Sequence, residues 1–215
     1  MSATIASIAV GRPTAINHNG KDVLTAIFKS PVTGRVAVSL GNIDGDGQAD
    51  LSVHGGRDKA VYAYPQCHYT HWAAILGRDT LDVSQFGENL TVTELDETNV
   101  VIGDRYRAGT VVMVVAQPRI PCFKLGIRVG DAAFPKRFLA SGRLGFYLRV
   151  EREGEFAAGD AIERLERPEH GITVHDLWQT VFDSGNARVD ATRCLELLPH
   201  IDAGWVRRLR NIAST

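Results

Sequence analysis

Short apolar runs separated by turn residues fill residues 1–165 of the chain. Their alternation, with glycine and proline between them, predicts β-strands joined by tight turns. The strongest runs lie at residues 5–10, 23–28, 35–38, 61–64, 89–93, 111–116 and 145–150. Pro31 and Gly34 stand between the second and third runs, so we expect those two strands to form a hairpin. The pattern indicates a mixed α/β, β-rich fold with a mostly antiparallel, barrel-like sheet.

Helical patterns interrupt these strands in two places. Residues 65–76 begin with a proline and carry Trp72, Ile75 and Leu76 on one side, and residues 135–141 have room for one or two turns. Strand and helix do not alternate regularly along the chain. A doubly wound parallel sheet is therefore not expected.

The pattern changes after residue 167, where three short amphipathic helices are predicted. Thr173, Asp190 and Asp202 each precede one of them and are typical helix caps. We therefore divide the chain into a β-domain at residues 1–165 and a C-terminal three-helix subdomain at residues 168–215.

The last predicted helix carries Arg207, Arg208 and Arg210. A basic turn of this kind occurs in DNA-binding helix-turn-helix proteins, but it also suits the negative end of any helix dipole. We interpret the helices as a docking or dimerisation subdomain. This makes a homodimer possible, and nucleic acid is not an expected partner.

Composition and charge narrow the protein class. The 215 residues are 44% hydrophobic and the net charge is −1, which gives no overall attraction to nucleic acid or to an anionic membrane. The first residues lack the pattern of a secretion signal, and no eighteen apolar residues run together. We expect a cytoplasmic protein without a membrane partner.

The three cysteines are far apart in the sequence, so neither a disulfide framework nor a CxxC motif is present. Cys67 and His71 are four residues apart on a predicted helix, but two ligands make a poor zinc site, and we interpret both as structural. Cys194 lies on an apolar helix face and is predicted to be buried.

Residues 42–50 form an acidic, glycine-rich loop that invites comparison with a calcium-binding EF-hand. Counted from Asp44, the positions that need glycine and glutamate hold Ala49 and Gly55. We therefore expect a loop whose aspartates bond to their own backbone.

Residues 53–64 suggest an anion site. Gly55 and Gly56 let backbone N–H groups converge, and Arg57 and Lys59 add positive charge. An ordinary tight turn explains the glycines equally well. Further along, Glu88 and Asn89 either bind a polar ligand or cap a turn.

Cys122 differs from the other cysteines in its setting. Pro118 and Pro121 restrict the backbone beside it, and Arg119 and Lys124 supply two cations. Positive surroundings favour the thiolate, which is both a nucleophile and a soft metal ligand. The sequence therefore predicts that Cys122 carries the chemistry.

Four motifs occur in the order HGGxxKAVYAY (54–64), FGENL (86–90), IGD (102–104) and QPRxPC (117–122). In this order they resemble the MOSC domain, the C-terminal module of molybdenum cofactor sulfurases. The stand-alone bacterial YiiM-like branch, which adds three helices, is the most similar. The resemblance implies a β-barrel whose pocket holds a molybdenum–molybdopterin cofactor, whereas pyridoxal phosphate is not expected.

The resemblance also implies an activity. Related proteins reduce N-hydroxylated compounds, including hydroxylamino purines, to amines, with electrons from a separate donor protein. Cys122 corresponds to the cysteine that ligates molybdenum or carries sulfur, and we expect it to be the catalytic residue and metal ligand. The residues expected to bind the cofactor are His54, Gly55, Gly56, Arg57, Lys59, Tyr62, Tyr64, Asn89, Arg119 and Lys124.

Two other hypotheses remain open from the sequence. The chain could be a non-catalytic carrier of the cofactor or of its sulfur. Alternatively, the β-domain could be a scaffold and the helices a regulatory or nucleic-acid contact.

Overall fold

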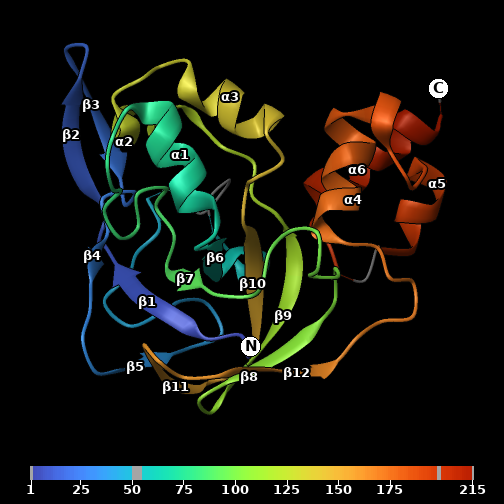
Figure 1. Cartoon of the computed structure of the whole chain (residues 1–215), viewed down its shortest axis with the longest axis horizontal. Helices are drawn as coiled ribbons and strands as arrows, with labels where there is room; N and C mark the ends of the chain where they lie inside the picture. The colour runs from blue at the N-terminus through green and yellow to red at the C-terminus, as the bar shows by residue number, and fades with distance from the viewer. Residues whose placement is uncertain (1, 50–54, 198–199, 215) are drawn as a thin grey trace.

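A computed structural model describes residues 2–49, 55–197 and 200–214. Its centre is an eight-stranded sheet with the order β12-β8-β9-β10-β6-β7-β1-β4 (Figure 1). The strands are β1 (Ile5–Val10), β4 (Ser30–Pro31), β6 (Val61–Pro65), β7 (Leu90–Val92), β8 (Arg105–Ala108), β9 (Val111–Pro118), β10 (Phe146–Arg152) and β12 (Ile162–Glu166). Strands β6 and β7 pair in parallel, and the other neighbours in the sheet are antiparallel. The predicted β-rich, mostly antiparallel fold is confirmed.

The sheet curls until its two ends approach each other. An isolated bridge joins Thr4 to Ala161, and the Ile162 amide donates to the Ala3 carbonyl over 2.8 Å. Within the described residues this contact is a bridge and does not extend into a ladder between named strands. A closed barrel is therefore not confirmed.

Strand β9 fixes the place where the site forms. All eight of its residues are buried, as the apolar run at 111–116 predicts. The strand ends at Pro118, whose ring leaves no N–H to continue a ladder. Arg119 and Cys122 therefore leave the sheet directly from a rigid core strand.

The predicted hairpin between residues 23–28 and 35–38 is wrong. Strand β3 (Lys21–Thr25) pairs with β2 (Thr14–His18), and β5 (Arg35–Val38) pairs with β11 (Gly154–Ala157). The true turn is Asn19–Gly20, whose φ angles of 53° and 78° are those of a tight type I′ hairpin. An apolar run shows that a strand forms, but not which strand it pairs with.

Three helices cover one end of the sheet (Figure 1). They are α1 (His68–Leu76), α2 (Phe123–Val129) and α3 (Phe134–Ala140). Pro65 is the last residue of β6 and does not begin α1, because the chain needs two more residues to turn away from the sheet. Buried aromatic rings from α1, α3 and the sheet form one cluster, which includes Tyr64, Trp72, Phe134 and Phe138.

The C-terminal helices α4 (Val174–Phe182), α5 (Ala191–Cys194) and α6 (Ala203–Ala213) lie beside the sheet (Figure 1). Single-turn 3-10 helices η2 (Ser184–Asn186) and η3 (Leu195–Leu197) connect them. The caps predicted at Thr173, Asp190 and Asp202 are confirmed, since each side chain accepts a backbone N–H of its helix.

The helices share one hydrophobic core with the sheet. Leu177, Cys194 and Leu209 belong to the same buried cluster as Ile102 and Val115. The boundary at residues 165–168 stays a prediction, because apolar packing is continuous across it. Among the described residues, none of the helices is long and apolar enough to cross a membrane.

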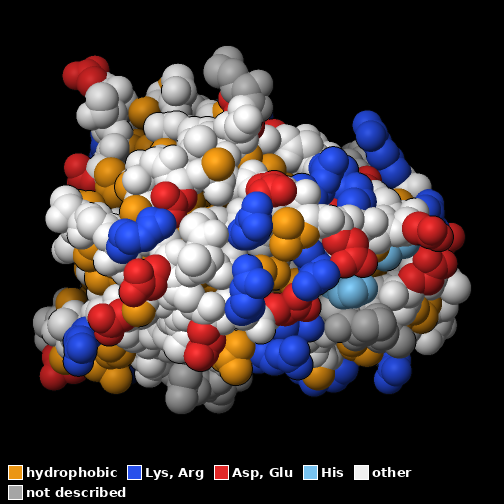
Figure 2. All heavy atoms as spheres, turned by 90° about the horizontal axis from the view of Figure 1, so that it is seen from below, with side chains coloured by type: hydrophobic (Ala, Val, Ile, Leu, Met, Phe, Trp, Pro, Cys, Tyr) orange, Lys and Arg blue, Asp and Glu red, His pale blue; other side chains and the backbone are white. Residues whose placement is uncertain are grey.

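Exposed charges on the face seen in Figure 2 are mixed in sign. The charged side chains of β8 pair with carboxylates on β10 and β12: Arg105 with Glu151 and Glu166, and Arg107 with Glu163. Such exposed pairs add little stability. They do mix positive and negative charges near the β12 end of the sheet, so no strip of like charges forms on these strands.

Candidate functional site around Cys122

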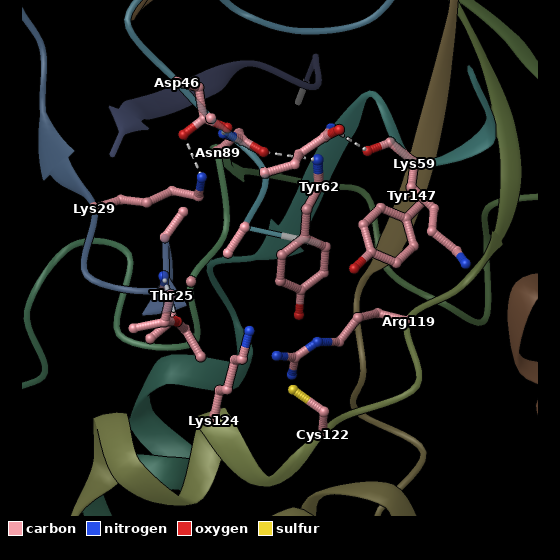
Figure 3. A pocket seen from close by; sticks show the side chains of 16 residues that line it. Thr25, Lys29, Asp46, Lys59, Tyr62, Asn89, Arg119, Cys122, Lys124 and Tyr147 are labelled. Carbon is pink, nitrogen blue, oxygen red and sulfur yellow. Dashed lines mark hydrogen bonds and ion pairs between the residues drawn. The ribbon is translucent and has the colours of Figure 1, made fainter. Parts of the chain in front are cut away.

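Cys122 is partly exposed at the start of α2. Its backbone is extended, with φ −117° and ψ 174°, and its carbonyl accepts the Leu125 amide over 3.0 Å. The extended cap position turns the side chain away from the helix and into a cavity (Figure 3). The sulfur is therefore accessible, as a metal ligand or nucleophile must be.

We call this space the Cys122 cavity; it has a volume of about 100 Å³. Its lining includes Thr25, Lys29, Asp46, Lys59, Tyr62, Asn89, Arg119, Cys122, Lys124 and Tyr147. The structure thus brings together six of the predicted site residues: Lys59, Tyr62, Asn89, Arg119, Cys122 and Lys124.

Arg119 is the most unusual of these residues. It is only 6% exposed, and its guanidinium lies 5.2 Å from the ring centre of Tyr62 and 5.5 Å from that of Phe138. Its Nη1 is buried and has no hydrogen-bond partner among the described residues. Figure 3 shows the guanidinium beside the Cys122 sulfur. A buried donor without an acceptor is costly unless a ligand meets it, and the Arg119 side chain is part of the cavity lining.

Lys29 and Asp46 form a buried ion pair in the cavity wall, with side chains only 8% and 3% exposed. Burial lowers the pKa of Lys29, and the carboxylate of Asp46 opposes that shift. Asp46 also accepts the Gly11 amide over 2.8 Å and the Asn89 side chain over 2.9 Å. The sequence predicts that the aspartates of loop 42–50 bond to their own backbone, whereas the Asp46 carboxylate accepts from Gly11, Lys29 and Asn89 instead.

Asn89 and Tyr62 line the cavity, but their polar atoms are already used. Asn89 accepts the Tyr62 amide over 3.1 Å and donates to Asp46, so its side chain fixes the wall. The Tyr62 hydroxyl donates to the Leu144 carbonyl over 2.7 Å, and burial raises the pKa of Tyr62 well above its usual range. Tyr62 can therefore offer a ligand the face of its ring.

The structure places other predicted residues elsewhere. Tyr64 is fully buried in the aromatic cluster, where its hydroxyl accepts Trp72 Nε1 over 2.7 Å, so its contact with a pterin is not supported. Tyr64 lies on the same face of β6 as Tyr62, two residues further along the strand, where the rings of Phe86 and Phe138 cover it. Gly56 and Arg57 line a separate hollow with Arg105, and His54 lies outside the described residues.

Glu88 is 1% exposed and does not line the cavity. It accepts the Phe86 amide over 3.0 Å and the Tyr69 hydroxyl. Burial raises the pKa of Glu88, and these donors oppose the shift. Of the two roles open from the sequence, the structure shows the turn cap.

A second space, the α6 hollow, adjoins the Cys122 cavity and has a volume of about 590 Å³. The two share Lys59, Cys122 and Tyr147. The remaining lining of the α6 hollow includes Gly55, Gln117, Asp202, Arg207 and Arg208. Cys122 therefore stands where two spaces meet.

Asp202 joins the two walls of this hollow. It forms an ion pair with Lys59 over 3.0 Å, accepts Gln117 Nε2 over 3.1 Å and caps α6 through the amides of Gly204 and Trp205. Burial alone would raise the pKa of Asp202, but the hydrogen bonds from Lys59 and the Trp205 amide lower it. The sequence indicates only the cap role of Asp202, because it does not show that α6 meets Gln117 at the end of strand β9.

The fold and this arrangement define a class of protein. The chain belongs to the MOSC domain family, which matches residues 50–163. Its structure is similar to the crystal structure of YiiM from Geobacillus stearothermophilus, with a TM-score of 0.78, 31% identity and coverage of 97% of this chain and 98% of that one.

Two relatives are similar in sequence. YflK of Bacillus subtilis is 43% identical over 171 residues, which are 80% of this chain and 77% of YflK. A protein named reductase from Gibberella moniliformis is 40% identical over 152 residues, which are 69% of this chain but only 27% of that protein. The family predicted from the four motifs is confirmed.

Proposed function

We propose that the chain is a molybdenum cofactor-dependent reductase of N-hydroxylated compounds, including hydroxylamino purines. One observation carries the proposal: the accessible sulfur of Cys122 lies beside Arg119, a buried cation whose Nη1 has no protein acceptor among the described residues. A soft ligand next to an unsatisfied cation suits a metal that is bound through an anionic organic group.

The residues present fit molybdopterin. Cys122 Sγ would ligate the metal, because thiolate sulfur matches the soft dithiolene ligands of the pterin. Arg119 and Lys124 would bind the anionic part of the cofactor, and Tyr62 would pack its ring against the pterin. The cavity of about 100 Å³ is small for such a group, so the bound cofactor would also occupy the part of the α6 hollow beside the shared residues Lys59, Cys122 and Tyr147.

When bound, the cofactor supplies a metal that accepts an oxygen atom from the substrate. The overall reaction is R–NHOH + 2 H⁺ + 2 e⁻ → R–NH₂ + H₂O. The chain's own contribution is to hold Cys122 at the start of α2 and to keep the buried Arg119 cation beside it, where charge interactions are stronger than in water.

The two electrons need an external source. The cysteines Cys67, Cys122 and Cys194 are exposed, partly exposed and buried respectively, on separate elements, and a four-cysteine iron–sulfur cluster needs more ligands than they provide. We therefore assign electron delivery to a separate donor protein.

The test compares protein from cells that make the molybdenum cofactor with protein from cells that cannot. Reduction of 6-hydroxylaminopurine by an artificial reductant should occur only with the first preparation. Cys122→Ser should lose the activity, whereas Cys67→Ser, at an exposed cysteine away from the cavity, should keep it. Equal activity in both preparations contradicts the proposal. Pterin and metal uptake without turnover would instead indicate the carrier function.

A further inference from the structure

The α6 hollow has a different character from the Cys122 cavity. In the cavity, the cations Lys29 and Arg119 are buried, which suits a ligand that stays bound. In the hollow, Arg207 and Arg208 are exposed on the first turns of α6. Because a ligand can bind to such exposed groups and return to solvent, the hollow suits a substrate that exchanges in every turnover.

The hollow is set up to bind an anion. Asp202 is its only carboxylate among the described lining residues, and that charge is already met by Lys59 and by two amides of α6. Within the described part of the chain, neither Arg207 nor Arg208 forms an ion pair, and Arg208 lies 5.7 Å from the ring centre of Phe182. Two arginines held near a hollow favour a doubly charged group such as a phosphate.

The lining of the hollow combines three kinds of groups. Cys122 and the half-buried Tyr147 are shared with the cavity, whereas Arg207 and Arg208 line the hollow alone. A ligand that contacts all of these groups needs a reducible N–O group for the site at Cys122, a flat ring for Tyr147 and an anion for the arginines. A nucleotide with an N-hydroxylated base has these three parts.

We propose that the α6 hollow is the substrate site and that Arg207 and Arg208 bind the substrate's phosphate, so that N-hydroxylated nucleotides are preferred to the corresponding nucleosides. This inference rests on the proposed reductase function for its chemistry. The phosphate site itself rests only on the hollow and its charges.

The experiment measures binding separately from turnover. Adenosine 5′-monophosphate and adenosine are titrated into the cofactor-loaded protein by calorimetry, with wild type, the double variant R207Q/R208Q and the control R210Q. Arg210 is exposed on the same helix but does not line the hollow. We expect the wild type to bind the nucleotide more tightly than the nucleoside. We also expect the double variant to weaken nucleotide binding about tenfold and the control to leave it unchanged.

A further measurement shows whether the arginines bind the phosphate of the substrate or that of the cofactor. Pterin content is determined for every variant by fluorescence after oxidation, and it should be equal in all of them. Loss of pterin in the double variant would overturn the inference, because the arginines would then bind the cofactor's own phosphate. Equal binding of nucleotide and nucleoside by the wild type, or an equal loss in R210Q, would overturn it as well.

Turnover of N6-hydroxyadenosine 5′-monophosphate and N6-hydroxyadenosine completes the test. The KM for the nucleotide should rise about tenfold in the double variant, while kcat/KM for the nucleoside should not change. If neither compound is reduced but the nucleotide preference persists in binding, the reductase function fails and the phosphate site stands.

Discussion

Replacing Asp46 by asparagine tests whether the wall of the Cys122 cavity depends on its buried ion pair. The side chains of Lys29 and Asp46 are only 8% and 3% exposed, so Asp46→Asn leaves an ammonium with little access to water and no anionic partner. Removal of one member of a buried pair costs about 3–5 kcal/mol. Because the asparagine carbonyl can still accept one of the bonds from Gly11 and Asn89, we expect about 3 kcal/mol.

Urea unfolding at pH 7, followed by fluorescence, measures this loss. Arg35→Gln is the matched control, because its pair with Asp160 is exposed at 49% and 24% and should be worth less than about 1 kcal/mol. The double variant K29M/D46N removes both charges and should recover much of the stability lost by Asp46→Asn. A loss no greater than that of the control, or a double variant no more stable than Asp46→Asn, would refute the reasoning.

The stability lost by Asp46→Asn should depend on pH. Burial lowers the pKa of Lys29 in the folded protein below its ordinary value of 10.5. A lysine of this kind destabilises the fold most below its folded pKa, and the penalty disappears as the pH rises to 10.5. Without Asp46 the pKa should fall further, so the gap between Asp46→Asn and wild type should narrow between pH 7 and pH 10.5.

Three further outcomes follow from the structure. Cys122→Ser should abolish reduction and change the unfolding free energy by less than about 1 kcal/mol. Cys194→Ser places a hydroxyl at a fully buried position, so it should cost about 1–3 kcal/mol in urea unfolding and leave activity unchanged. The reverse result would show that Cys122 is not the cysteine that carries the chemistry. Arg119→Met removes the unsatisfied donor, so the purified protein should contain little pterin by fluorescence. Because the methionine still packs against Tyr62, the Tm of the variant should not be lower than that of the wild-type protein without cofactor. Burial would lower the pKa of His68, but hydrogen bonds to Cys67 and Glu97 raise it to about 9. The stabilisation by His68 is complete below about pH 6.5 and lost as the pH rises through about 9, so the unfolding free energy of wild type, measured with urea, should fall by on the order of 2–3 kcal/mol across that window, and His68→Gln should show no such fall.

The sequence predicted those parts of the fold that depend on local patterns. The buried strand β9 and the three capped helices follow from apolar runs and from side chains such as Thr173 that bond within one turn. The pairing of β3 and β5 could not be predicted in this way, because it depends on the remote partners β2 and β11. The turn that does carry a local signal, Asn19–Gly20, was missed although both residues suit positive φ.

Local spacing predicts only the part of the candidate site that comes from one segment, whereas Lys59, Tyr62 and Asn89 are expected there from the family resemblance. Arg119, Cys122 and Lys124 come from one segment and meet in one cavity. Lys29 and Asp46 come from two separate loops, and no spacing in the sequence indicates that they form a pair. The sequence indicates only a helix-dipole role for Arg207, because its place in the same hollow as Cys122 depends on how α6 packs.

The continuous core beneath β9 and the C-terminal helices limits how this protein could be re-engineered. Exchanging the entire helical segment with that of a relative would cut through the cluster that holds Leu177, Leu209 and Val115, and every buried contact would need repacking at once. Grafting only the solvent-facing positions of α6 leaves that cluster intact. New specificities should therefore be easier to obtain by recoding one helix face than by recombining modules.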